Sequence, residues 1–273
     1  MKLTPYQSRY GMPIGEPQIE TNEFITGILQ HSSCKRFDNK PLPDGMLELL
    51  IGAAQSASTS GMLQTWSVIA LTTPEDKAKL ISSPENHRII GEKDSQNYIA
   101  IDTSSVVLLW LADLSRVNDI LKNEPNARLK AQTTRAEYHL KAVIDATIAA
   151  QTCFIAAEAM GLSGTYCGAI RQLPIEFLEK EFNLPKYTFP IFGTILGYAL
   201  HKTNVVKPRL PLDVVLHHSS YKQADDTALK EYDKILSIRT HSSYKKRVVE
   251  RMVPSETKSW VGDSLRHMGF NFK

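Results

Sequence analysis

The sequence predicts a single α+β domain, and three features of the chain indicate this class. Residues 139–160 place apolar or small side chains on nearly every face of a helix, which is typical of a core helix. The apolar runs 106–111 and 190–198 are expected for central strands of a sheet. The sequence shows no internal repeat, no low-complexity tract and no linker that would divide it into domains. We therefore expect one domain over residues 21–273 that ends in a helical excursion, preceded by an extension over residues 1–20.

Composition and charge exclude several classes of protein. The 273 residues are 42% hydrophobic and 22% charged, which is ordinary for a soluble globular protein. A net charge of +3 is too small to indicate a nucleic-acid or membrane surface. The N-terminus lacks the apolar core of a signal peptide, and the apolar run 106–112 is too short to cross a bilayer. Cys34, Cys153 and Cys167 lie far apart without C-x-x-C spacing, so we expect a reducing cytoplasm and no metal site.

The first part of the chain shows a series of helix and strand signals. Residues 1–20 hold three prolines, so we expect them to form no regular helix and to lie extended or loose. Apolar spacing predicts a helix from Thr21 to about His31, with Thr21 or Asn22 as its cap. Further elements follow in order: a helix from 44 to about 55, a strand at 66–71, a charged helix at 75–81, a looser region to 96, and the buried strand at 106–111.

The second part begins with the charged segment 118–137, which is either a solvated excursion or a lid. Gly161 is expected to end the central helix in a left-handed conformation. The short apolar run 165–171 then contains Gly168, which would let a ligand approach the backbone closely. The alternative interpretation of this segment is an ordinary core strand. The remaining elements are a helix at 175–182, the strand at 190–198, a rigid basic loop at 207–211 and a helical, basic C-terminal region.

Three polar loops form the candidate binding residues. The chain contains no G-x-G-x-x-G, G-x-x-x-x-G-K-[ST], H-E-x-x-H or G-x-S-x-G motif, so the usual dinucleotide, P-loop, zinc-protease and hydrolase anchors are absent. The loops carry cations and hydroxyls: His31, Ser33 and Lys35; Ser58, Thr59 and Ser60; Lys207 and Arg209. Each alone is also typical of a solvated surface loop. Together with the glycine-interrupted strand they fit a cofactor with one phosphate and a flat ring, namely flavin mononucleotide (FMN).

An ordered set of short motifs resembles the nitroreductase superfamily. The motifs are HSSCKRF at 31–37, AAQSASTSGMLQ at 53–64, GLSGTYCGAIR at 161–171 and KPRLP at 207–211. The branch that they resemble is the oxygen-insensitive NADPH nitroreductases and NADPH-flavin oxidoreductases. The resemblance implies an intertwined homodimer with a mostly antiparallel central sheet flanked by helices, and with FMN held at the subunit interface.

The resemblance also implies roles for individual residues. His31, Ser33, Lys35 and Arg209 would hold the phosphate and ribityl chain, and Ser58, Thr59 and Ser60 would line the same end from the second subunit of the homodimer. Gln96 would bond the pyrimidine edge, Lys207 would lie near N1 and O2, and the Gly168 amide would point at N5 beside Tyr166 and Cys167. The sequence departs from the branch at four positions: Ser32 and Lys35 replace arginines, and Cys167 and Ala169 replace Ile and Gly. The change at Lys35 keeps the charge but loses a bidentate fork.

The function implied is an FMN-dependent oxidoreductase with a ping-pong mechanism. It would take a hydride from NAD(P)H and reduce nitroaromatics, quinones or free flavin, with Lys207 as an electrostatic stabiliser and no other catalytic side chain. The alternative is a storage or sensor module that binds FMN without turnover. The basic segment 237–247 is either a contact for the 2′-phosphate of NADPH or a solvated helix face. Its Lys245-Lys246-Arg247 run indicates nucleic-acid binding only weakly, because Glu250 lowers the local positive charge.

Overall fold

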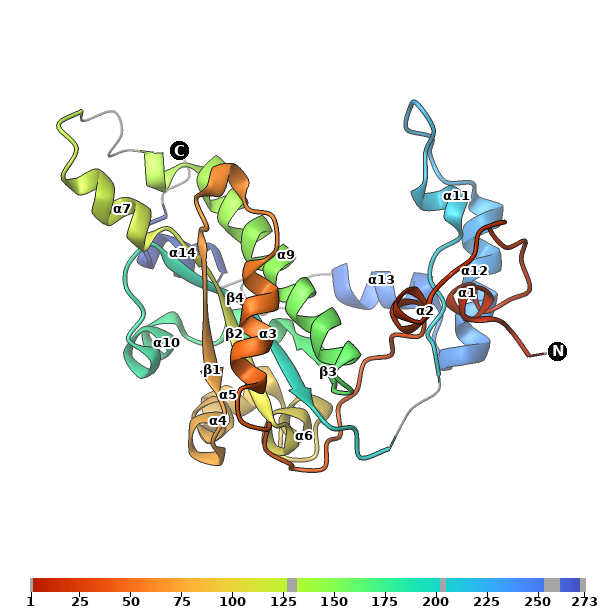
Figure 1. Cartoon of the computed structure of the whole chain (residues 1–273), viewed down its shortest axis with the longest axis horizontal. Coiled ribbons are helices and arrows are strands. Elements are labelled where there is room, and N and C mark those ends of the chain that lie inside the picture. The colour runs from red at the N-terminus through yellow and green to blue at the C-terminus, as the bar shows by residue number, and fades with distance from the viewer. Residues whose placement is uncertain (1, 127–131, 202–204, 253–260, 271–273) are drawn as a thin grey trace. The chain divides into compact units, whose positions relative to one another are not determined.

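The computed structural model describes residues 2–126, 132–201, 205–252 and 261–270 (Figure 1). The chain divides into two compact units. The smaller unit comprises Met1–Ser32 and Thr203–Lys258, and the larger unit comprises Ser33–Lys202 and Ser259–Lys273. The assignment of residues 21–273 to one domain stays a prediction.

The larger unit is built on a four-stranded antiparallel sheet with the order β1-β2-β4-β3. The strands are β1 (Trp66–Leu71), β2 (Val106–Asp113), β3 (Ser163–Cys167) and β4 (Thr188–Gly197). All eight residues of β2 are buried, because β1 and β4 flank this strand and helices cover it. A register shift between Trp110 and Leu111 marks a bulge against β4. The predicted antiparallel sheet is therefore confirmed.

Helix α9 (Ala136–Ala159) lies against all four strands, and α3 (Met46–Gln55) packs beside it (Figure 1). Its buried face consists mainly of alanines, which allow the helix axis to approach the sheet closely. The opposite face exposes Leu140, Ile144 and Ile148, which are spaced by four residues. Within one chain, the sheet and α3 cover only one side of this helix, so its outer apolar side chains are exposed.

Among the described residues, α9 is the one helix whose length and apolar composition would also allow it to span a membrane. Core helices of soluble proteins meet the same criterion, and the sheet contacts of α9 are those of a core helix. Gly161 follows the helix with a φ of 85°, which confirms the predicted left-handed stop.

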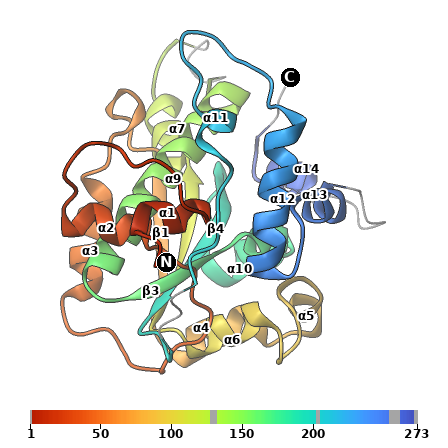
Figure 2. The ribbon, with the colours of Figure 1, turned by 90° about the vertical axis from the view of Figure 1, so that its right-hand side faces the viewer.

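The remaining elements of the larger unit surround this sheet. Helices α4 (Pro74–Ile81), α5 (Pro84–Ile90) and α6 (Gln96–Thr103) gather at one end of it (Figures 1 and 2). The region 82–96 was expected to be loose, and α5 contradicts this: Ser83 caps the helix and Pro84 suits its first turn. The other elements are η1 (Ser60–Met62), α7 (Ser115–Lys122), η2 (Gln132–Thr134), η3 (Gly168–Gln172), α10 (Ile175–Phe182) and α14 (Val261–His267).

The segment 118–137 is only partly a solvated excursion. Asn118 lies in α7 with 7% of its surface exposed, and its Oδ1 accepts a 3.4 Å hydrogen bond from the Thr133 hydroxyl. Both ends of the segment are thus anchored to the unit. The lid hypothesis covers the whole segment, and residues 127–131 of it lie outside the described residues.

The smaller unit contains α1 (Pro5–Tyr10), α2 (Glu23–Leu29), α11 (Leu212–Val215), α12 (Asp226–Thr240) and α13 (Tyr244–Met252). Helix α1 contradicts the prediction that residues 1–20 form no regular helix. Pro5 occupies the first helical position, where its missing N–H costs nothing, and Thr4 and Gln7 form a reciprocal capping box. The α2 prediction is confirmed, with Asn22 as the capping residue.

Candidate functional site

The stretch 207–209 in the smaller unit presents two cations. Lys207 and Arg209 are exposed, whereas Pro208 between them is buried. The Tyr232 hydroxyl donates to the Pro208 carbonyl over 3.2 Å, and the Arg209 guanidinium donates to the Lys207 carbonyl over 3.0 Å. The backbone of this stretch is therefore fixed while both charged groups stay accessible to an anion.

His31 belongs to the same unit and is held next to this stretch. The Arg9 guanidinium donates to the His31 carbonyl over 2.9 Å and contacts the Lys207 carbonyl at 3.5 Å. The Ser32 hydroxyl donates to the Val205 carbonyl over 3.0 Å. The structure thus brings together three of the residues predicted to form the site, namely His31, Lys207 and Arg209.

Lys35 in the larger unit is held at the start of α6. Its Nζ donates to the Asn97 side-chain oxygen over 3.0 Å. Gln96 precedes Asn97 as an exposed residue in the first turn of this helix, and Ser95 caps it. The structure therefore places Lys35 near the predicted Gln96. Ser33, two residues before Lys35, is exposed.

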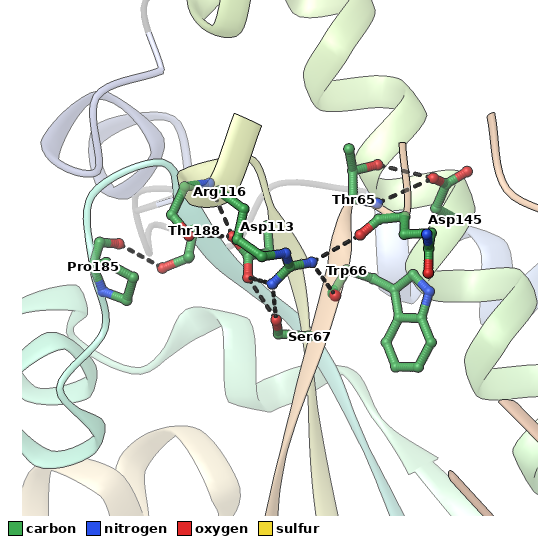
Figure 3. A network of polar contacts seen from close by, with 10 residues as sticks. Thr65, Trp66, Ser67, Asp113, Arg116, Asp145, Pro185 and Thr188 are labelled. Atoms are coloured by element: carbon green, nitrogen blue, oxygen red, sulfur yellow. Dashed lines mark hydrogen bonds and ion pairs between the residues drawn. The ribbon is translucent and has the colours of Figure 1, made fainter. Parts of the chain in front are cut away.

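The loop that carries Ser58, Thr59 and Ser60 is fixed by a buried carboxylate, whose bonds to Thr65 are drawn in Figure 3. Asp145 of α9 is 1% exposed, and its two oxygens accept the Ser60 amide at 2.9 Å and the Thr65 hydroxyl at 2.9 Å. The Thr65 amide also donates to it over 3.4 Å. Within the loop, the Gln64 amide donates to the Thr59 hydroxyl over 3.0 Å. The central helix thus sets the conformation of the hydroxyl loop.

A second carboxylate anchors the end of the same loop (Figure 3). Asp113, at the end of β2, accepts a 2.7 Å hydrogen bond from Arg116 and is 5% exposed. The Arg116 guanidinium also donates to the Gln64 carbonyl at 2.8 Å and the Trp66 carbonyl at 2.9 Å. The Ser67 hydroxyl donates to Asp113 over 2.5 Å. These bonds join the end of β2 to the start of β1, where the loop ends.

Tyr166 lies among aromatic rings on β3. Its ring stacks on Phe154 at 5.2 Å with an interplanar angle of 11° and meets the edge of Phe192 at 5.0 Å. Its hydroxyl donates to Gln151 over 3.0 Å. Partial burial raises the pKa of the Tyr166 hydroxyl, so this group stays protonated at neutral pH. Tyr166 therefore presents a neutral, flat surface.

The end of β3 is tightly packed at Cys167 and Gly168. Cys167 lies opposite Gly193 in the sheet and is 2% exposed. Burial raises the pKa of the Cys167 thiol, which makes it a poor nucleophile. At Gly168 a Cβ atom would lie 2.9 Å from a guanidinium nitrogen of Arg171. The space beside Gly168 is therefore bordered by the guanidinium group of Arg171, which can move more easily than a backbone segment could.

Five residues that organise these segments were not predicted from the sequence: Arg9, Asn97, Arg116, Asp145 and Arg171. Asp145 alone carried a visible signal, because an acidic residue in an apolar helix needs buried donors. Across the described ranges no group of three or more His, Cys, Asp or Glu residues is placed to hold a metal ion.

Comparison with known proteins identifies the class of this chain. Residues 28–198 match the model of the nitroreductase family, and residues 207–273 match the model of its C-terminal domain. The chain therefore belongs to the nitroreductase family and is an enzyme of this kind.

Individual relatives are similar over most of the chain. A Cr(VI) reductase from Pseudomonas sp. is 32% identical, over 90% of this chain and 98% of its own length. An oxygen-insensitive NADPH nitroreductase from Salmonella typhimurium is 32% identical, over 80% of this chain and 81% of its own length. The solved structure of an NADPH:FMN oxidoreductase from Vibrio harveyi in complex with NAD+ has a TM-score of 0.77 and is 27% identical, over 91% of this chain and 98% of that one. The predicted resemblance is therefore confirmed.

Proposed function

We propose that this protein is an FMN-dependent oxidoreductase that takes electrons from NAD(P)H and passes them to nitroaromatics, quinones or free flavin by a ping-pong mechanism. The observation that carries the proposal is the pair of family matches, because every candidate flavin ligand falls within residues 28–198 or 207–273. The names of relatives that use NADPH or reduce flavin support the same activity. When bound, FMN supplies the hydride and electron transfer itself.

In the smaller unit, we assign the phosphate and the reactive edge of the ring to different residues. Arg209 and His31 are proposed to hold the phosphate, because an exposed guanidinium gives a bidentate contact to a phosphate group. Lys207 is proposed to lie near N1 and O2 and to stabilise negative charge there. The accessible cations of this stretch fit an anionic ligand.

In the larger unit, the proposed contacts are mainly neutral donors. Ser33 and Lys35 are proposed to hold the phosphate and ribityl chain, and the loop 58–60 would supply hydroxyls at the same end. Gln96 would bond the pyrimidine edge, and the segment 166–168 would border the ring. Burial raises the pKa of the Cys167 thiol, and it raises the pKa of the Cys153 thiol to about 12. Both thiols therefore stay protonated and would not compete as nucleophiles.

We also propose that the protein is a cytoplasmic homodimer, as the resemblance implies. The exposed stripe of Leu140, Ile144 and Ile148 on α9 supports a second copy of the chain as its cover. Sedimentation velocity at micromolar concentration is expected to give the mass of a dimer. A folded, FMN-loaded monomer would exclude this assembly.

The experiment that tests the activity begins with the cofactor. The purified protein is expected to be yellow or to become so on incubation with FMN, with quenching of free FMN fluorescence. Steady-state rates with NADPH and a quinone are then expected to give parallel lines in double-reciprocal plots, the pattern of a ping-pong cycle. A protein that stays colourless with excess FMN would rule the proposal out.

A further inference from the structure

The last turn of α1 is bonded to the two segments that carry His31 and Arg209. The Arg9 guanidinium donates to the Leu29 carbonyl through Nε at 3.1 Å and to the His31 carbonyl at 2.9 Å. It contacts the Lys207 carbonyl at 3.5 Å. In the reverse direction, the Arg209 amide donates to the Arg9 carbonyl over 2.8 Å. One side chain and its own backbone thus join residues 29–31 to residues 207–209.

Packing at the next turn reinforces this connection. Gly11 ends α1 with a φ of 75°, and a Cβ atom there would lie 2.7 Å from Pro208 and 2.8 Å from Ile235. The backbone of α1 therefore lies directly against Pro208, between the two proposed cationic ligands. Such close packing leaves little freedom for the backbone at 207–209.

These contacts come from a part of the chain outside the family pattern. The nitroreductase model begins at residue 28, and α1 ends at Tyr10. Arg9 therefore belongs to a segment that the matched family model does not include.

We infer that Arg9 is a positioning residue for phosphate binding, and that the N-terminal segment of this chain is part of its cofactor-binding apparatus. The inference rests on the proposed function. The planar guanidinium fixes carbonyls from both segments at once, so that His31 and Arg209 are held in place before the phosphate arrives. Arg9 itself contributes no contact to the phosphate in this account.

The test compares FMN with riboflavin, which lacks the phosphate. Kd is measured by fluorescence for the full-length wild-type protein and for Arg9→Ala, Arg9→Lys, Arg209→Ala and the double variant Arg9→Ala/Arg209→Ala. Arg251→Ala, an exposed arginine of α13 in the same unit, is the matched control. Thermal unfolding of each apoprotein shows whether it is folded. If Arg9→Ala does not fold, Arg9→Lys decides the question.

We expect Arg9→Ala to raise the Kd for FMN about tenfold and to leave the Kd for riboflavin within about twofold of wild type. Arg9→Lys keeps the charge but not the fork, so it should also bind FMN weakly. In the Arg209→Ala background, the Arg9 change should lose the part of its effect that acts through Arg209 and keep the part that acts through His31, so the two effects should be less than additive. FMN binding by Arg9→Lys equal to wild type, additive effects in the double variant, or equal weakening for riboflavin would overturn the inference. Failure of the wild type to bind FMN would instead remove the proposed function as well.

Discussion

Asp145 provides the sharpest test of how the hydroxyl loop is held. Asp145→Ala removes the acceptor of the Thr65 amide and hydroxyl, and Thr65 is 1% exposed, so neither donor can turn to water. A buried donor left without an acceptor costs about 1–3 kcal/mol, whereas the partly buried Ser60 amide regains a water. Two such donors lower the expected free energy of unfolding by about 2–6 kcal/mol. Asp145→Asn keeps the volume and one acceptor oxygen, and should lose about 1–2 kcal/mol.

The assay is urea unfolding of the apoprotein followed by tryptophan fluorescence, to which Trp66 of β1 and Trp110 of β2 contribute from the same unit. Combining Asp145→Ala with Thr65→Val gives a double-mutant cycle for the hydroxyl–carboxylate bond. A hydrogen bond to a charged group predicts a coupling energy of about 1.5–3 kcal/mol. A loss below about 1 kcal/mol for Asp145→Ala, or a coupling near zero, would show that the carboxylate does not hold the loop.

Three further predictions concern phosphate binding, pH and the hydride donor. Arg209→Ala should weaken FMN binding by about 1.5–3 kcal/mol through loss of a charge-assisted contact, and an unchanged Kd would remove Arg209 from the site. Hydrogen bonds from Lys186 and His267 lower the pKa of Glu179 below its ordinary value of 4.5. Its contribution to stability is therefore present above pH 4.5 and is lost as the pH falls through the lowered value. Because Glu179 and its partners lie near the surface, Glu179→Gln should reduce the loss of unfolding free energy at acid pH by at most about 1 kcal/mol, as measured by urea unfolding at several pH values. An unchanged pH dependence of the unfolding free energy would contradict this role of Glu179. If segment 237–247 contacts the 2′-phosphate, kcat/KM should show a modest NADPH preference that shrinks with salt, since exposed charges are screened over about 8 Å at physiological ionic strength. A large preference that salt does not change would indicate a buried phosphate pocket instead.

The elements that sequence reasoning predicted well are those whose signals are local. The strand 66–71 matches β1 at both ends, and the helix expected at 75–81 corresponds to α4, which starts one residue earlier. Strand β2 is predictable from its apolar run. A strand that is buried on both faces has apolar residues at every position and no alternation of apolar and polar residues. Helix α1 is hidden in the sequence by three nearby prolines, although the only one inside the helix, Pro5, occupies the permitted first position.

Apart from Asp145, the residues that organise the candidate site carry no local signal in the sequence. Arg9 bonds to carbonyl groups of residues 29, 31 and 207, and any residue type supplies a carbonyl. Asn97 contacts Lys35 across 62 positions of the chain, so its proximity depends on the fold. The exposed face of α9 is likewise a property of the tertiary structure, because its sequence alone resembles a fully buried helix.

Anaerobic reduction of the holoprotein shows whether bound flavin carries electrons between two substrates. NADPH is added stepwise to the FMN-loaded protein while the visible flavin absorption is recorded. A quinone is then added after the nucleotide has been removed. We expect one equivalent of NADPH per FMN to bleach the flavin absorption, and the quinone to restore it without nucleotide present. Flavin absorption that persists in excess NADPH and NADH would contradict this expectation and would instead indicate a module that binds FMN without turnover.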